Sequence, residues 1–313
     1  MTGGLREQAG DYLQMRHDLG YELDRPGRLV RQFAGWCDDA GITFVTSDRA
    51  LEWAMLPQEV TSWYRWLRLS AVRGFAAWLH AFDPAHQVPP ADLLPCRQDR
   101  PAPCLLSGSD VNALMAAAAG LRPAVHAATY QTLIALAAAT GIRPCEAIRM
   151  NDGDADPATL VLTVHGKNHK ERQIPLHPTT AAALDSYARL RDRELPRHEV
   201  PAFLVSTAGA RLTPGRASEV FAMLVSRAGL APAGPGTRRP VLNSLRHSFA
   251  VTTLISWLND GTNVEASLPA LSAWMGHKKP RSTYWYLQAV PELLQAASDH
   301  MTRAAARQPG TRP

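Results

Sequence analysis

Cysteines, long apolar runs and internal repeats are scarce or absent in this sequence. Four of the 313 residues are cysteine, at positions 37, 96, 104 and 145, and no two of them have C-x-x-C spacing. Neither a disulfide framework nor a thiolate zinc site is therefore expected. No apolar run approaches the ~20 residues that span a bilayer, and residues 1–7 lack the pattern of a signal peptide. These absences predict a cytoplasmic protein with no membrane partner.

Length and charge suggest two domains with different electrostatic character. A single hydrophobic core stops growing near roughly 250 to 300 residues, so a chain of this length favours two domains. Residues 1–100 contain 11 Lys+Arg and 13 Asp+Glu, a net charge of −2. The whole chain has 33 and 28, so residues 101–313 contain 22 and 15, a net charge of +7. The positive second part favours a polyanionic partner.

Prolines cluster between positions 84 and 103, where six occur. Proline lacks a backbone donor, so this stretch is predicted to be an extended linker rather than a helix or an inner strand. We therefore expect a helical domain over 1–88, a linker over 89–104, a second domain over 105–300 and a tail over 301–313.

The first domain carries one basic helical segment. Apolar residues recur at helical spacing between positions 63 and 79, and no acidic residue lies between Glu59 and Asp83. Arg65, Arg68 and Arg73 project from the rest of this helix. They either grip phosphates or form an ordinary solvated face.

The second domain is predicted to be mainly helical with one β-hairpin. An Ala-rich helix over about 124–140 ends at Gly141, and Pro144 suits the first turn of the next helix. Alternating apolar residues predict strands near 160–164 and 172–176, with Lys167 and Lys170 at the hairpin tip. A loop over 230–240 carries Arg238 and Arg239. Further helices are predicted at about 178–194, 216–229, 244–258, 266–275 and 291–305. The expected fold class is thus mainly α with a small antiparallel sheet: a helical N-terminal domain plus a mixed α+β domain.

Four short motifs follow one another in this second domain. They are Thr140-Gly-Ile-Arg-Pro-Cys-Glu146, Gly166-Lys-Asn-His-Lys-Glu-Arg172, Leu245-Arg-His-Ser-Phe-Ala250, and Met275-Gly-His277 followed nine positions later by Tyr286. Each motif is weak alone, but their order and spacing are specific. In this respect the sequence resembles the tyrosine recombinases of the phage integrase family, over about residues 105–300. Residues 68–95 also look like the core-binding domain of that family.

The resemblance implies a DNA strand transferase. Such enzymes cleave one strand at a time, form a covalent 3′-phosphotyrosyl intermediate and rejoin the strand to a new 5′-hydroxyl, without ATP, metal or other cofactor. The implied partner is double-stranded DNA at the nucleoid, held between two domains that close as a clamp. A homo-tetramer on two DNA sites, or an assembly with related recombinases, is implied as well. The run from Thr283 to Leu294 looks closest to recombinases of transposons and other mobile elements.

The matched residues suit this chemistry. Arg143 and Arg246 present paired, permanently charged donors for the non-bridging oxygens of the phosphodiester. Tyr286 is the expected nucleophile, with Tyr284 as a rival two residues away. Lys167 is expected to protonate the leaving 5′-oxygen, with Lys170 as the alternative or as a DNA contact.

Three further positions have supporting roles in this interpretation. His277 is expected to hydrogen bond to the scissile phosphate or to assist the tyrosine, and Glu146 to support Arg143. Asn243 stands where the family usually has histidine. An amide donates a hydrogen bond to a phosphate oxygen but cannot transfer a proton. His247 points ~100° away from Arg246 on a helix, so it is not expected to replace the missing histidine.

Other readings remain open from the sequence. Asn243 is also compatible with a DNA-binding regulator whose cleavage is impaired, and a relaxase resembling type IB topoisomerases shares the same chemistry. His165 and His169 lie four apart, but they fall in a predicted strand and turn without a third ligand, so a metal site is not expected. The target sequence and the natural direction of the reaction are not encoded in any recognisable motif.

Overall fold

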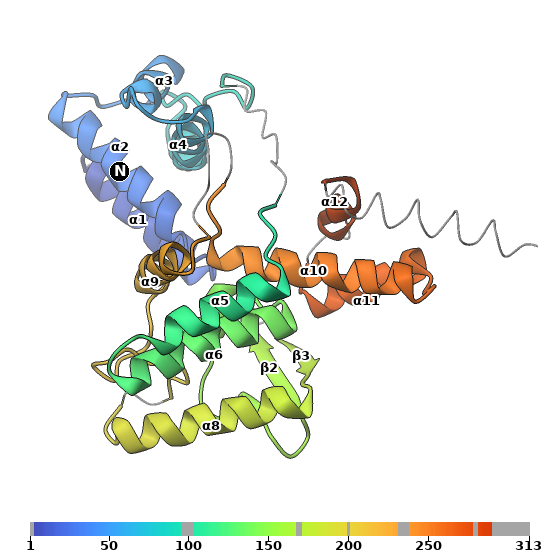
Figure 1. Ribbon diagram of the computed structural model, residues 1–313. Coiled ribbons are helices and arrows are strands. Elements are labelled where there is room, and N and C mark those ends of the chain that lie inside the picture. The colour runs from blue at the N-terminus through green and yellow to red at the C-terminus, as the bar shows by residue number, and fades with distance from the viewer. Residues whose placement is uncertain are drawn as a thin grey trace, which may run out of the picture. The chain divides into compact units, whose positions relative to one another are not determined.

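Among the described residues up to position 94, four helices surround a core of their own (Figure 1). The computed structural model describes residues 3–94, 103–166, 171–198, 201–230, 238–277 and 281–289. The chain divides into two compact units, Met1–Arg100 and Pro101–Pro313. The predicted linker over 89–104 is described only at its two ends, and the predicted tail over 301–313 lies outside the described residues.

The helices of the first unit are α1 (Leu5–Asp18), α2 (Asp24–Asp39), α3 (Ser47–Met55) and α4 (Ser62–Phe82). The hydroxyls of Thr46 and Thr61 cap α3 and α4 by accepting a backbone N–H at each N-terminus. Phe33, Phe75 and Leu69 are fully buried between the helices. This confirms the helical character predicted for the first part of the chain.

The second unit has eight helices and one small sheet within the described residues (Figure 1). The helices are α5 (Gly108–Ala119), α6 (Ala124–Thr140), α7 (Pro144–Arg149), α8 (Pro178–Glu194), α9 (Pro214–Arg227), α10 (Leu242–Asn259), α11 (Val264–Trp274) and α12 (Arg281–Ala289). The strands β1 (Ala155–Asp156), β2 (Val161–His165) and β3 (Glu171–Pro175) pair antiparallel in the order β1-β2-β3. The predicted hairpin is therefore confirmed, whereas β1 and α12 were not predicted.

The sheet positions the hairpin by alternation. Leu162 and Val164 of β2 and Ile174 of β3 point into the core, and their neighbours point away from it. Val161 pairs with Pro175 and His165 with Glu171. The register therefore places Gly166 directly after the last paired residue of β2.

Helix α6 is the centre of the second unit. It contacts α5, α7, α8 and α10, and Tyr130, Leu133 and Ile134 on it are almost completely buried. Gly141 ends the helix with φ of 63°, a left-handed conformation that favours glycine. A side chain at position 141 would collide with the ring of Phe249. This stop sets the start of α7, and with it the position of Arg143.

A separate core joins the last three described helices. Val251 and Leu254 of α10, Leu268 and Leu271 of α11, and Tyr286 of α12 form one buried cluster. Figure 1 shows α10 and α11 side by side, and α11 also contacts α12. The cluster packs α12 against α10 and α11. Among the described residues, no helix is both long enough and apolar enough to cross a membrane.

Candidate active site

Arg143 lies at the break between α6 and α7 and is held from two directions. Its Nη1 donates to Glu146 Oε1 at 2.7 Å, and its Nη2 donates to the carbonyl oxygen of Gly276 at 2.7 Å. The predicted contact between Arg143 and Glu146 is therefore present. The side chain of Arg143 remains 35% exposed, so its guanidinium is accessible to a ligand.

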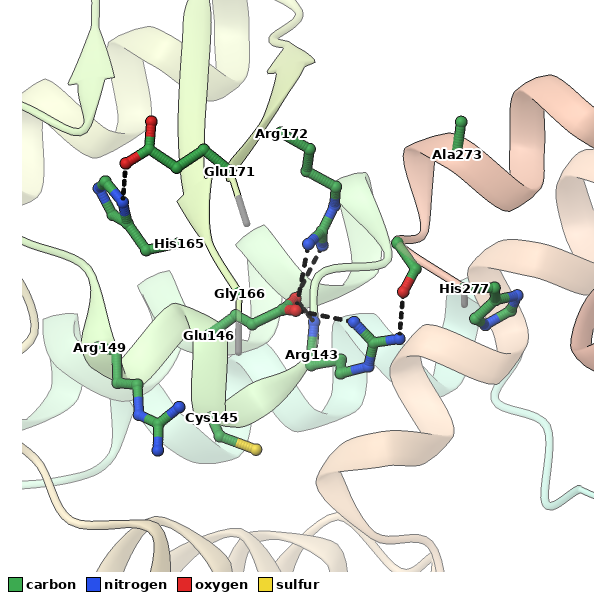
Figure 2. A pocket seen from close by; sticks show the side chains of 11 residues that line it. Arg143, Cys145, Glu146, Arg149, His165, Gly166, Glu171, Arg172, Ala273 and His277 are labelled. Carbon is green, nitrogen blue, oxygen red and sulfur yellow. Dashed lines mark hydrogen bonds and ion pairs between the residues drawn. The ribbon is translucent and has the colours of Figure 1, made fainter. Parts of the chain in front are cut away.

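Glu146 orients a second arginine that was given no role from the sequence. Arg172 of β3 donates from Nη2 and Nη1 to the two carboxylate oxygens of Glu146, at 2.7 and 3.1 Å. Its Nε donates to the carbonyl oxygen of Trp274 at 2.8 Å. Figure 2 shows the carboxylate of Glu146 between the two guanidiniums. One buried carboxylate thus fixes Arg143 and Arg172 in a single arrangement.

The charge of Glu146 is set by these partners. Burial alone would raise the pKa of Glu146, but the hydrogen bonds and charges of Arg172, and then of Arg143, outweigh it and hold the pKa below its ordinary value. The carboxylate therefore contributes stability above its unfolded-state pKa, near 4.5. That contribution is lost as the pH falls through the lower folded-state pKa.

We expect Glu146→Gln to lower the free energy of unfolding by about 3 kcal/mol at pH 7, because it leaves buried guanidinium charge without its counter-ion. The difference between wild type and variant should shrink as the pH falls below the unfolded-state pKa and through the lower folded-state pKa, where the wild-type carboxylate also loses its charge. Urea unfolding at several pH values measures both effects. Glu219→Gln is the control, because Glu219 and its partner Arg216 are mostly exposed. Equal losses of unfolding free energy for the two variants would contradict a stabilising role for the buried carboxylate of Glu146 between Arg143 and Arg172.

Arg246 is almost completely buried beside this group. Its Nη1 donates to the carbonyl oxygen of Gly141 at 2.5 Å, and its Nη2 donates to that of Met275 at 2.6 Å. Burial, followed by the like charge of Arg143, lowers the pKa of Arg246 to about 10, while Tyr286 and Glu146 act in the opposite sense. At neutral pH Arg246 is therefore still a cation.

The turn after α11 anchors both candidate phosphate ligands. Arg246 binds the carbonyl of Met275, and Arg143 binds that of the next residue, Gly276. Gly276 has φ of 63°, and a Cβ atom there would lie 2.8 Å from Nη1 of Arg172. Glycine at this position therefore allows the turn and the close approach of Arg172. Trp274 adds a further tie by donating from Nε1 to the carbonyl of Thr140 at 2.8 Å.

Tyr286 lies on α12 with its hydroxyl near α10. Nδ1 of His247 is 2.8 Å from the hydroxyl oxygen of Tyr286, and Nε2 of the same ring is 2.8 Å from Nδ2 of Asn243. Tyr286 is 2% exposed and acts electrostatically on Arg246, whereas Tyr284 is 41% exposed. Of the two candidate tyrosines, Tyr286 is therefore the buried one, with its hydroxyl on His247 and with an electrostatic effect on Arg246.

The remaining predicted residues divide between the site and the undescribed segments. His277 lines the pocket and its Nδ1 is hydrogen bonded to the hydroxyl of Thr283 at 2.7 Å. Lys167 and Lys170 lie outside the described residues, although Gly166, directly before Lys167, lines the pocket. The pocket has a volume of about 530 Å³ and combines Arg143, Arg149 and Arg172 with His277 (Figure 2). Glu146 and Glu171 line the cavity as well, so the three guanidiniums are the groups there that suit a polyanionic ligand.

The sequence interpretation missed Arg172 and His247, although both stand inside the quoted motifs. Arg172 could have been found from the strand alternation, which places it on the same inward face as Ile174, where a charged side chain needs a partner. His247 could have been found from its spacing, because residues four apart on a helix are neighbours and Asn243 is four residues earlier. The ~100° rotation from Arg246 is what directs His247 to α12 while Arg246 points to the carbonyls.

One of the three arginines proposed to grip phosphates in the first unit is buried. Arg68 is 7% exposed, donates from Nη2 to the carbonyl of Trp53 at 2.8 Å and lies 3.6 Å over the ring of Trp53. Its charge is used inside the helical core, which leaves Arg68 little surface for the predicted phosphate contact. Arg65 and Arg73 are half-buried and donate to backbone carbonyls, those of Pro57 and Gln58 and those of Pro89 and Pro90 respectively.

The remaining predicted positions are two arginines and two histidines of the second unit. Arg238 is exposed, and Arg239 donates to the carbonyl of Ala222 and the hydroxyl of Ser226. His165 lies between Asp154 and Glu171, with ring nitrogens 3.0 and 2.9 Å from their carboxylate oxygens. No group of three or more metal-ligating residues occurs in the described part of the chain, and His169 lies outside it.

Comparison with known proteins identifies the family. The sequence profile of the phage integrase family matches residues 105–292, more than half of the chain. The chain belongs to the phage integrase family. As a tyrosine recombinase, it is an enzyme that cleaves and rejoins DNA strands through a phosphotyrosyl intermediate. The integrase/recombinase y4rB of Sinorhizobium fredii is 33% identical to it, over 95% of this chain and 97% of the relative. Tyrosine recombinase XerD of Neisseria meningitidis serogroup B is 25% identical, over 91% of this chain and 88% of the relative.

Solved structures confirm the fold of this tyrosine recombinase. The Tn1549 transposon integrase in complex with transposon right end DNA has a TM-score of 0.65 at 15% identity, over 96% of this chain and all of that one. A lambda integrase tetramer bound to a Holliday junction has a TM-score of 0.60 at 15% identity, over 90% of this chain and 76% of that one. These likenesses confirm the predicted fold class, a mainly helical protein with a small antiparallel sheet.

Proposed function

We propose that this recombinase acts on a mobile genetic element, and that Arg143, Arg246 and Tyr286 carry its chemistry. The observation that supports this most directly is the attachment of both arginines to consecutive carbonyls, those of Met275 and Gly276, with Tyr286 acting electrostatically on Arg246. A phosphodiester bound to Arg143 would have its negative charge offset before the phenol attacks. A local opening that admits the phosphate to the buried Arg246 and Tyr286 is part of the proposal.

In the proposed cleavage step, one bond to phosphorus forms as another breaks. The oxygen of Tyr286 forms a bond to phosphorus and releases its proton to water, while the bond from phosphorus to the 5′-oxygen breaks. Lys167 gives that oxygen a proton, and His277 and Asn243 donate hydrogen bonds to the phosphate. Rejoining reverses these steps with a new 5′-hydroxyl. The energy of the broken bond is kept in the phosphotyrosyl ester, so no ATP is needed.

The proposed partners are two double-stranded DNA sites and further protomers. A tetramer is proposed because the lambda integrase structure of the same fold is a tetramer on a Holliday junction. Action at the cytoplasmic nucleoid follows from the DNA substrate. We propose that the DNA backbone is contacted by Lys170, Arg238 and Arg239. The same contact is proposed for Arg65 and Arg73, whose guanidiniums also donate to backbone carbonyls of their own unit.

A nicked suicide substrate tests the central proposal. After cleavage, the short fragment that carries the free 5′-hydroxyl diffuses away, so a covalent protein–DNA adduct accumulates. Digestion of the adduct then identifies the peptide that is attached to the DNA. We expect the adduct on Tyr286, and exchange of strands when two sites are supplied. Binding without an adduct would indicate a regulator instead, and relaxation of supercoiled DNA without exchange would indicate a relaxase.

Lys167 can be tested with a modified leaving group. We expect Lys167→Ala to slow cleavage about 100-fold, because the 5′-oxygen would depart without a proton. A substrate with sulfur in place of that bridging oxygen should restore most of the rate, since a thiolate leaves readily without protonation. Lys170→Ala should weaken DNA binding with no sulfur rescue. Rescue of Lys170→Ala in place of Lys167→Ala would assign the role of general acid to Lys170.

Substitution of Arg68 in the first unit and of Arg238 in the second should have different outcomes. Arg68→Met should lower the free energy of unfolding by about 2 kcal/mol, because the carbonyl of Trp53 loses a charged donor. It should not change the slope of log DNA affinity against log salt, since a buried side chain releases no counter-ion. Arg238→Met should leave stability unchanged and reduce that slope by about 1. A reduced slope for Arg68→Met would show that this residue does reach the DNA.

A further inference from the structure

Three side chains from two helices form one hydrogen-bonded chain that ends at the proposed nucleophile. Asn243 and His247 lie four residues apart on α10, one turn of the helix, and therefore on the same face. Nδ2 of Asn243 is 2.8 Å from Nε2 of His247, and Nδ1 of His247 is 2.8 Å from the hydroxyl oxygen of Tyr286. The rings of His247 and Tyr286 are 5.6 Å apart at 58°.

The amide determines which nitrogen of the imidazole carries the proton. An amide NH₂ group can only donate, so Nε2 of His247 must accept from Asn243. A neutral ring that accepts at Nε2 carries its proton on Nδ1, and this N–H points at the oxygen of Tyr286. Hydrogen bonds to a charged acceptor are stronger than those to a neutral one. The contact therefore favours the phenolate over the phenol and fixes the direction of its attacking oxygen.

We propose that His247 is a catalytic residue that donates from Nδ1 to the attacking oxygen of Tyr286, and that Asn243 is a positioning residue that holds His247 in the required tautomer. This inference rests on the proposed role of Tyr286 as nucleophile. It gives Asn243 a function beyond a phosphate contact, because an amide carries two N–H groups and the contact with His247 uses one. The departure from the usual histidine at position 243 thereby acquires a physical purpose.

Two substitutions at position 247 form a matched pair. Asparagine places its amide nitrogen close to the position of the imidazole Nδ1, so His247→Asn keeps a donor to Tyr286, whereas His247→Leu removes it. In single-turnover cleavage of the suicide substrate we expect His247→Leu to be slower than wild type by about 10- to 100-fold. His247→Asn should recover most of this loss. Equal rates for the two variants, or a rate for His247→Leu at or above that of wild type, would overturn the proposal.

The role of Asn243 requires a double-mutant cycle. Asn243 is exposed, so Asn243→Ala is expected to fold normally. It should slow cleavage by about 3- to 10-fold in the wild-type background and by less beside His247→Asn, where there is no tautomer to fix and only the proposed phosphate contact is lost. The same loss in both backgrounds would show that Asn243 does not act through His247. The sulfur-containing substrate should rescue none of these variants, because they act on the nucleophile and not on the leaving group.

Nitrogen-15 NMR of histidine-labelled free protein tests the tautomer without any reaction. We expect a ring with its proton on Nδ1 whose signals disappear in His247→Asn, and a shift toward the Nε2–H form in Asn243→Ala. A proton on Nε2 in the wild-type ring would overturn the assignment. Failure of the proposed function gives a different pattern, because wild type itself would then form no adduct at Tyr286 whatever the state of His247.

Discussion

Tyr286→Phe should abolish the covalent adduct with a nicked substrate, to below detection, while DNA binding is retained. The variant keeps the aromatic ring that packs against Leu268 and Leu271 in the cluster of the last three helices. It removes only the oxygen atom, and no neighbouring side chain can take over an attack directed from that position. Adduct formation measured by a gel shift under denaturing conditions, with binding measured on native gels, separates the two effects.

Tyr284→Phe is the matched control, two residues away on the same helix. Tyr284 is 41% exposed and Tyr286 is 2% exposed, so the control changes a surface hydroxyl that does not face the arginines. We expect Tyr284→Phe to cleave at close to the wild-type rate. An adduct that survives Tyr286→Phe but is lost in Tyr284→Phe would exchange the roles of the two tyrosines and remove the basis for the role proposed for His247.

Arg246→Lys should slow cleavage by about 1000-fold, although it keeps the formal charge. The guanidinium reaches the carbonyls of Gly141 and Met275 at once and has further N–H groups for a phosphate. A lysine has one nitrogen and cannot span both carbonyls. Burial disfavours the charged form of the ammonium as well, which lowers a lysine pKa from its ordinary value of about 10.4. The rate of adduct formation under single-turnover conditions measures the loss.

Arg191→Lys is the control for the loss of a buried arginine. Arg191 is 2% exposed and donates to Asp152 and to the carbonyls of Ala202 and Phe203, none of which belongs to the proposed site. We expect this variant to unfold at a lower urea concentration but to cleave normally when folded. Similar cleavage losses in Arg191→Lys and Arg246→Lys would mean that the effect comes from stability rather than from contact with the phosphate.

Most helices could be predicted from the sequence because their signals are local. Gly141 ends α6 and Pro144 begins α7, as predicted. The predicted hairpin follows from alternation in the same way. Strand β1 escaped prediction because two residues carry no periodic pattern. Helix α12 escaped because its apolar residues gain their partners from α10 and α11, which are distant in the sequence.

The arginines of the first unit show the limit of pattern reasoning. The spacing of Arg65, Arg68 and Arg73 on α4 is compatible with a solvated face and with a DNA contact. Only the packed structure shows that the guanidinium of Arg68 covers Trp53 and binds its carbonyl. Periodicity gives the direction in which a side chain leaves its helix, but not what another element places in front of it.

The sequence by itself determined the identity of the chemical groups: two arginines, a lysine, a histidine and a tyrosine, in an order and spacing that resemble one enzyme family. Residue types and their spacing are properties of the sequence, so they can be compared directly with those of a family. The tertiary structure decided which carbonyls anchor each arginine, that Glu146 serves both Arg143 and Arg172, and that His247 faces Tyr286. Such contacts join residues between 3 and 133 positions apart. They depend on how α10, α11 and α12 pack, because packing brings together groups that no local pattern relates.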